Sequence, residues 1–256
     1  MRTRGPWLMR RRSGCGPRIL AAAALFTATA AAEPDLPHVH LDPERRFVEI
    51  DAEVIGPDAD WLELLVCTAG GREHEALLRT PALPSHVNLG LLLLGLEPGR
   101  PAHTGPDGVF LPAEGPPVRL TIRSPDNAFE PADAGTWLLD RDAGETLAGA
   151  SWRYTGSRVL ADAAGPVFLA DANGTLASLV SFGDDLILLD LARAAGLDAG
   201  NDGQRFAASA AVPPAGTAVR LRIEAVAFDT GPAAPDTPVS SPARPVSPAS
   251  PQDADP

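Results

Sequence analysis

Residues 61–80 read WLELLVCTAGGREHEALLRT, and this stretch decides the expected fold. Residues 61–67 are apolar apart from one glutamate, as in a buried strand. Residues 68–71 supply two glycines that can adopt a left-handed turn, and residues 72–80 provide a second strand. We therefore expect these residues to form a β-hairpin.

A short helix is expected directly after this hairpin, where residues 84–95 read PSHVNLGLLLLG. Ser85 can cap the first turn, Gly95 can end the helix in the left-handed conformation, and Pro98 cannot continue it. Leucines surround the expected axis, which predicts a buried helix. Its ten residues are too few to span a membrane.

The rest of the pattern is mainly typical of strands. Asn173 and Gly174 form a strong turn signal, which predicts a hairpin between residues 167–170 and 175–180. The other expected elements are strands at residues 47–52, 118–123 and 152–155, a closing pair of strands at residues 206–212 and 217–226, and a capped helix at residues 184–195.

These elements together predict the α+β class. We expect one domain with an antiparallel-rich sheet and one short buried helix after the second strand of the hairpin. The domain is expected to span residues 33–229. Residues 230–256 are expected to form a disordered tail, since eight of these 27 residues are proline and only two are large aliphatics.

The N-terminus has the pattern of a cleavable secretion signal. Six arginines precede an uncharged, apolar run of 14 residues, which ends in three alanines at Ala32. A membrane-spanning helix needs about 20 residues, so we interpret this run as a signal and not as an anchor. We expect residues 1–32 to be removed, with either Met1 or Met9 as the start, and the protein to be exported to the periplasm or outside the cell.

Charge and composition exclude several function classes. Without residues 1–32, the chain keeps 15 arginines against 33 acidic residues, a formal charge of −18. Such a surface repels nucleic-acid phosphates and anionic lipid head groups, so nucleic-acid binding is not expected. The chain contains no lysine, which excludes a Schiff-base lysine and a phosphate-loop lysine. Cys67 is the only cysteine after residue 32, so no internal disulfide can form.

Several blocks spread over the expected domain are recognisable. Residues 67–75 read CTAGGREHE, residues 91–99 read LLLLGLEPG and residues 152–157 read WRYTGS. Together with FGDD at residues 182–185 and PPAGT at residues 213–217, these blocks resemble the YdjY domain family. The resemblance implies a small exported bacterial protein of undefined biochemical role, and it supplies no catalytic residues. Some relatives are described as ferredoxin-like, but an iron–sulfur cluster needs four ligands of the thiolate type and the expected mature chain has one.

The candidate site consists of Cys67, His74, Glu75 and His86, which lie in or beside the expected hairpin and helix. Thiolate, imidazole and carboxylate groups all bind zinc or copper. Residues 74–78 begin like the H-E-x-x-H zinc motif, but the last position is leucine, so that motif is rejected. The competing interpretation makes Cys67 a buried small hydrophobe and His74 a half-buried, hydrogen-bonded imidazole in a strand.

Two other groups are interpreted as structural. His38 and His40 share one face of a strand and are taken as incidental. Asp184 and Asp185 are interpreted as the start of a helix and not as a pair of catalytic acids.

The sequence thus favours an exported, non-catalytic domain without a cofactor. It is expected to bind an unidentified protein or small molecule in the cell envelope, with no nucleic acid and no membrane span. The alternative is a metal-binding or redox accessory protein that uses the region of Cys67, His74 and His86 with zinc or copper.

Overall fold

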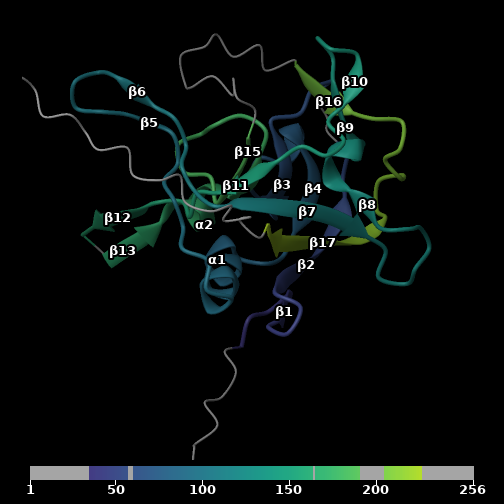
Figure 1. Cartoon of the computed structure of the whole chain (residues 1–256), viewed down its shortest axis with the longest axis horizontal. Coiled ribbons are helices and arrows are strands. Elements are labelled where there is room, and N and C mark those ends of the chain that lie inside the picture. Colours follow the sequence, from purple (N-terminus) through teal and green to yellow (C-terminus); the bar gives the residue numbers. More distant parts are fainter. Residues whose placement is uncertain (1–34, 57–59, 164, 191–204, 227–256) are drawn as a thin grey trace, which may run out of the picture. The chain divides into compact units, whose positions relative to one another are not determined.

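A computed structural model describes residues 35–56, 60–163, 165–190 and 205–226 (Figure 1). The predicted signal segment and the predicted proline-rich tail lie outside the described residues. Of the described helices, none is long and apolar enough to cross a membrane.

Eight strands form a closed β-barrel. In their order around the ring, they are β2 (Phe47–Val54), β17 (Ala218–Ala225), β7 (Pro117–Arg123), β11 (Trp152–Tyr154), β15 (Ile187–Leu189), β14 (Thr175–Ser178), β3 (Leu64–Thr68) and β4 (Ala76–Thr80). The ring is closed because β4 also pairs with β2, where Val54 lies opposite Leu78.

Further strands extend the barrel or lie apart from it. β1 (Val39–Asp42) pairs with β2, and β8 (Ala132–Asp133) pairs with β7. A three-stranded sheet is formed by β10 (Glu145–Thr146), β9 (Leu138–Asp140) and β16 (Phe206–Ala208). The remaining strands of the described residues form two ribbons: β5 (His103–Thr104) with β6 (Phe110–Leu111), and β12 (Val159–Asp162) with β13 (Gly165–Phe168).

The predicted α+β class is therefore wrong, because the described residues are mostly β. In the described part of the chain, helical structure is limited to α1 (Pro84–Leu93), α2 (Leu169–Asn173) and the short 3₁₀ turns η1 (Glu73–Glu75) and η2 (Ala134–Trp137). A sheet that closes on itself buries one of its faces inside the ring, so it needs no helical layer to cover that face.

The core lies inside this ring, on one face of each alternating strand. Ile50 of β2, Leu221 of β17 and Leu120 of β7 are fully buried, and the residues between such positions point outward. Trp152 and Tyr154 of β11 are also fully buried. The alternation read from residues 47–52 and 118–123 is confirmed by this arrangement.

The expected hairpin over residues 61–80 is wrong, because β3 and β4 run parallel. Leu64 lies opposite Ala76 and Thr68 lies opposite Thr80, and η1 belongs to the segment that carries the chain back between them. Four of the five residues in each strand are buried. Strands buried on both faces are typical of parallel pairs, and their continuous apolar pattern contains no signal for direction.

Three other expected elements are also wrong. Asn173 and Gly174 end α2, with Gly174 in the left-handed conformation at φ 75°, and form no hairpin. The described part of the expected helix at residues 184–195 contains β15. The expected closing pair does not form, because β16 pairs with β9 while β17 pairs with β2 and β7.

The expected helix is present as α1, but the prediction that it is buried is wrong. Val87, Gly90 and Leu91 face the core, whereas the leucines on the opposite face are exposed: Leu89 by 38%, Leu92 by 43% and Leu93 by 51%. The helix covers one part of the barrel and its outer side has no described cover. Because the barrel is a single closed sheet, the described part of the fold has no second layer that would cover the outer side of the helix.

The C-terminal end of α1 is closed by a Schellman motif. The amide of Gly95 donates to Leu92 O at 2.8 Å, and the amide of Leu96 donates to Leu91 O at 3.1 Å. Gly95 has φ 79°, which confirms its predicted left-handed role. This motif fixes the direction in which the chain leaves the helix.

Candidate functional site

Cys67 lies in β3, where it is fully buried against Leu64 and Ala76. Burial, followed by the charge of Glu73, raises the pKa of its thiol to about 12. A protonated thiol enclosed by apolar side chains behaves as a small hydrophobe and is a poor nucleophile and metal ligand.

His74 lies in η1 and not in a strand, and its side chain is 66% exposed. The prediction of a half-buried imidazole in a strand is wrong, because the 3₁₀ turn directs its successive side chains to different sides. His74 Nε2 lies 3.6 Å from Glu75 Oε2. Glu75 itself is buried, and its carboxylate accepts a hydrogen bond from Arg72 Nη1 at 3.0 Å.

His86 lies half-buried in α1, and its Nδ1 atom is buried without a hydrogen-bond partner among the described residues. Within the described ranges, no hydrogen bond or ion pair joins Cys67 or His86 to the other candidates, and the ion pair among the four joins His74 to Glu75. Nor do any three His, Cys, Asp or Glu side chains of the described ranges lie so that they could hold a metal ion. The charge of Glu75 also contributes to the raised pKa of Cys67.

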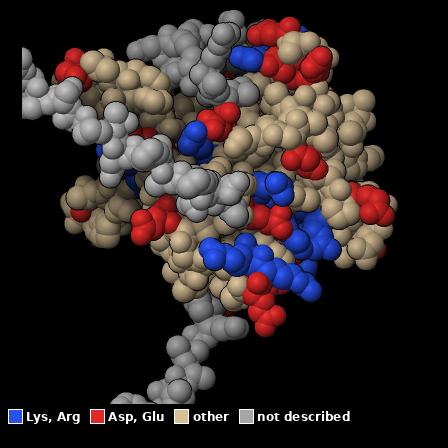
Figure 2. All heavy atoms as spheres, viewed as in Figure 1, with Lys and Arg blue, Asp and Glu red and all other residues tan. Residues whose placement is uncertain are grey.

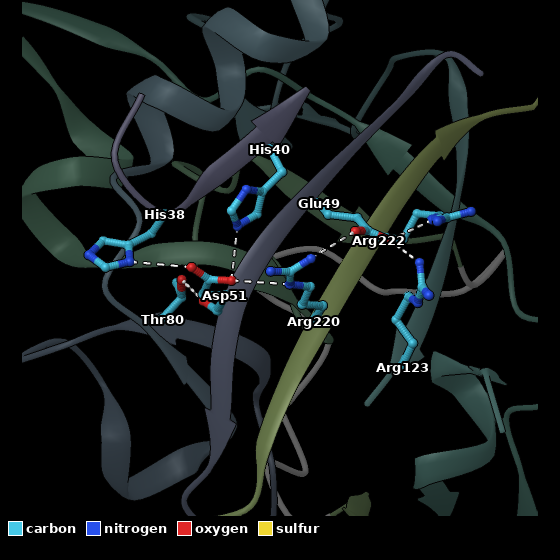
Figure 3. Close-up of polar contacts among 8 residues, drawn as sticks. All are labelled: His38, His40, Glu49, Asp51, Thr80, Arg123, Arg220 and Arg222. Atoms are coloured by element: carbon cyan, nitrogen blue, oxygen red, sulfur yellow. Dashed lines mark hydrogen bonds and ion pairs between the residues drawn. The ribbon is translucent and has the colours of Figure 1, made fainter. Parts of the chain in front are cut away.

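A different polar surface lies on the outer face of four neighbouring strands, β1, β2, β17 and β7 (Figure 3). Because side chains alternate along a strand, the outward residues of these strands line up across them. They form three rows: Asp42, Phe47, Glu224 and Arg119; His40, Glu49, Arg222 and Thr121; and His38, Asp51, Arg220 and Arg123. We refer to these twelve residues as the arginine face.

Glu49 lies at the centre of the arginine face and is only 4% exposed. Its Oε1 accepts hydrogen bonds from Arg222 Nε at 2.8 Å and Arg123 Nη1 at 2.9 Å, and Arg220 lies 3.9 Å away. Burial alone raises the pKa of this carboxyl, but the hydrogen bonds from Arg222 and Arg123 outweigh it, so that its pKa is lowered. Glu49 is therefore held ionised by several guanidinium groups.

Asp51, in the next row, lies between two imidazoles and one guanidinium (Figure 3). Its carboxylate is 3.0 Å from His40 Nε2, 3.4 Å from His38 Nδ1 and 3.3 Å from Arg220 Nε. Burial acts to raise its pKa, yet His40, His38 and Arg220 together lower it. His38 and His40, which the sequence suggested were incidental, thus connect β1 to the barrel.

A pocket of about 700 Å³ adjoins the first row of the arginine face. Its charged residues are Arg45, Arg46, Arg119, Glu97 and Glu224. The remaining lining is apolar or glycine and consists of Gly95, Leu96, Pro116, Pro117, Ala225 and Val226. This volume lies within the range of about 300–1,000 Å³ that is usual for small-molecule sites.

The three arginines of this pocket differ in how they are engaged. Arg45 lies 3.7 Å from Asp42, and Arg46 Nη2 donates to Leu94 O at 3.3 Å. Arg119 is exposed, and no described residue forms an ion pair or hydrogen bond with its guanidinium. Its cross-strand neighbour Glu224 is instead 3.6 Å from Arg222. Arg119 therefore has its donors available to a ligand.

Arg46 also takes an unusual backbone conformation, with φ 59°. The left-handed region is costly for residues other than glycine and persists where the surrounding structure enforces it. Here it occurs in the turn between β1 and β2, beside the pocket. Figure 2 shows arginines gathered over β7 and β17, in the part of the surface that lies next to α1 in Figure 1.

Asp184 and Asp185 lie in the loop between β14 and β15, so the prediction that they start a helix is wrong. Asp185 is fully buried and accepts hydrogen bonds from Ser181 Oγ and from the amides of Phe182 and Gly183, at 3.1–3.2 Å. Asp184 accepts hydrogen bonds from Thr175 Oγ1 at 3.0 Å and from Asn173 Nδ2. Both side chains are therefore used in hydrogen bonds within or beside their own loop, which lies between two parallel strands.

The architecture defines this protein as a closed β-barrel domain with an arginine-lined pocket on its outer side. The chain matches the family model of the YdjY domain over residues 39–224, and it belongs to that family. The match begins in β1 and ends in β17, so it includes the whole barrel. No significant match was found among curated proteins or among solved structures.

Sequence reasoning missed the arginine face and the pocket. The alternation along residues 47–52 and 118–123 placed Glu49 and Arg119 on outward faces. It could not show that these strands meet across β17, because their pairing joins residues more than 70 positions apart in the chain.

Proposed function

We propose that this protein is an exported, non-catalytic binding domain whose pocket beside the arginine face takes a small organic anion. The observation that carries the proposal is Arg119, a guanidinium without a described partner at a pocket with two further arginines. Arginine presents a planar set of donors that fits carboxylate and phosphate oxygens.

The charge of the pocket supports an anionic ligand within a chain that is otherwise acidic. Three arginines face two glutamates there, whereas the whole chain has a formal charge of −12. Glu224 is already near Arg222, which reduces its effect on Arg119. A local excess of positive charge on an acidic surface concentrates small anions at that position.

A binding role is favoured over catalysis by the state of the titratable groups. Glu49 and Asp51 have lowered pKa values and are held by arginine and histidine, so neither is suited to carry a proton. The alternative metal-binding or redox role at Cys67, His74 and His86 gains no support from the positions of these side chains.

The test is anion binding by wild type and by Arg119→Gln, measured as a change in melting temperature and by calorimetric titration with succinate and inorganic phosphate. The variant should bind at least about tenfold more weakly, because a charge-assisted hydrogen bond contributes about 1.5–3 kcal/mol. Arg158→Gln is the matched control, since Arg158 is an exposed arginine just before β12 and its substitution removes the same charge. Equal weakening in both variants, or no saturable binding of either anion, would contradict the proposal.

A further inference from the structure

The C-terminal end of α1 reaches the pocket, and the helix carries exposed leucines on one face. Leu89, Leu92 and Leu93 are spaced by three and four residues, so they lie along one face of the helix. The helix ends in the Schellman motif, and the two residues that complete it, Gly95 and Leu96, line the pocket. With a rise of 1.5 Å per residue, about 9 Å separates Leu89 from Gly95 along the axis.

The helix and the motif that ends it carry no charged side chain. Residues 84–96 contain no Asp, Glu, Lys or Arg, in a chain where these residues make up 21% of the total. Arg46 reaches the same end of the helix through its hydrogen bond to Leu94 O. A row of leucines thus ends beside the three arginines of the pocket.

We infer that the ligand of this pocket is an amphiphilic anion, with its acidic group at Arg119 and Arg46 and its alkyl chain along Leu89, Leu92 and Leu93. This inference rests on the proposed function and names the class of ligand. The apolar residues of the pocket receive the first carbons of the chain, and the leucines of α1 receive the rest. The alkyl chain of the ligand covers the leucine side chains and removes them from water, which accounts for the exposed apolar face of α1.

The ligand is a monomeric amphiphile and not a lipid in a bilayer. The chain without residues 1–32 carries a formal charge of −18, which repels an anionic membrane surface as a whole. A single small anion experiences mainly the local field of the pocket, because charges more than about 8–10 Å away are screened at physiological salt.

The test is a chain-length series of octanoate, decanoate and laurate, titrated below their micelle concentrations into the mature protein. Each methylene group that leaves water should tighten binding about fourfold, so each step of two carbons should tighten it about fifteenfold. In Leu92→Gln/Leu93→Gln this dependence should become weaker while octanoate binding remains. Arg119→Gln should weaken all three ligands by a similar factor.

Val159→Gln/Leu160→Gln is the matched control, because these two residues are also aliphatic and exposed, by 61% and 46%, but lie in β12. It should leave the chain-length dependence unchanged. Affinities that depend on Arg119 but not on chain length would overturn the inference and leave the proposed function in place. If the wild-type protein binds none of the anions, both the inference and the proposed function are overturned.

Two further measurements test whether the exposed Leu89, Leu92 and Leu93 bind a membrane or a second copy of the chain instead. In a flotation assay, vesicles of phosphatidylglycerol should not carry the protein with them. Flotation of the protein that depends on Leu92 and Leu93 would show binding to lipid in a bilayer and would overturn the inference of a monomeric ligand. In sedimentation velocity, a wild-type dimer that becomes monomeric in Leu92→Gln/Leu93→Gln, with unchanged laurate affinity, would show a self-association surface and overturn the inference.

Discussion

At Asp185, burial and hydrogen bonding act in opposite directions on one carboxyl group. Burial raises its pKa to about 6, although Ser181 and two backbone amides donate hydrogen bonds to it. The FGDD block contains both acidic residues of this loop, but its sequence gives no sign that one of them is fully enclosed. The loop joins β14 and β15, which pair in parallel with each other, and β14 also pairs with β3, more than 100 positions earlier in the chain.

The raised pKa predicts a pH dependence of stability. Asp185 binds its proton more tightly in the folded than in the unfolded state, where the pKa is about 3.9. The stability that it contributes is therefore complete below about pH 4 and is lost as the pH rises through about 6. Asp185→Asn lacks this titration, so the unfolding free energy of wild type relative to the variant should fall by on the order of 2–3 kcal/mol between pH 4 and 7.

The measurement is denaturant unfolding of both proteins across that pH range. The comparison with the variant is needed because Glu49 and Asp51 have lowered pKa values and lose stability as the pH falls, in the opposite sense. These groups are common to both proteins and cancel in the difference. A difference that stays constant with pH would contradict the assignment to Asp185.

The elements themselves could be read from the sequence better than their partners could. The Gly95 end of α1 and the alternation of β2 and β7 follow from local rules, and both are confirmed. The direction of β3 against β4 could not be read, because both strands are buried on each face and carry no alternation. For α1, a run of leucines indicates an apolar helix, and only the packed structure shows which leucines face the core.

The two faces of α1 should therefore differ sharply in their effect on stability. Leu91 is fully buried, so Leu91→Ala should lower the unfolding free energy by about 2–5 kcal/mol. Leu92 is the next residue and is 43% exposed, so Leu92→Ala should change it by less than about 0.5 kcal/mol. Chemical denaturation of the two variants measures both values, and equal losses would show that the outer face is covered in solution.

At the scale of the whole molecule, strand pairing between distant parts of the chain determines both the fold class and the site. The pairing of β2 with β4 closes the ring, and β17 pairs with both β2 and β7, so Glu49 meets Arg123 across 74 positions of sequence. Local patterns predicted strands, and a helix beside a sheet was the simplest way to cover their apolar faces. The pocket and the arginine face could not be predicted for the same reason, since both depend on these long-range pairings.

Closure also predicts how the molecule opens. β17 pairs with β2 along one edge and with β7 along the other, and Leu221 and Ile223 are fully buried. Releasing this strand breaks two ladders and exposes the core, so its amides should exchange with solvent only through global unfolding. Among the described strands, β12 and β13 pair only with each other, and all residues of β12 are exposed. Its amides should exchange through local opening.

Native-state hydrogen exchange measures this contrast directly. If the domain has an unfolding free energy of about 5 kcal/mol or more, amides of β17 should exchange at least about a thousandfold more slowly than those of β12 and β13. Leu221→Ala should accelerate exchange in β17 and in β2 together, because both strands open in the same event, and it should leave the β12–β13 ribbon unchanged. Similar protection of the ribbon and the barrel would mean that the exposed Val159 and Leu160 are covered in solution, and uncoupled exchange in β2 and β17 would contradict a cooperative, closed ring.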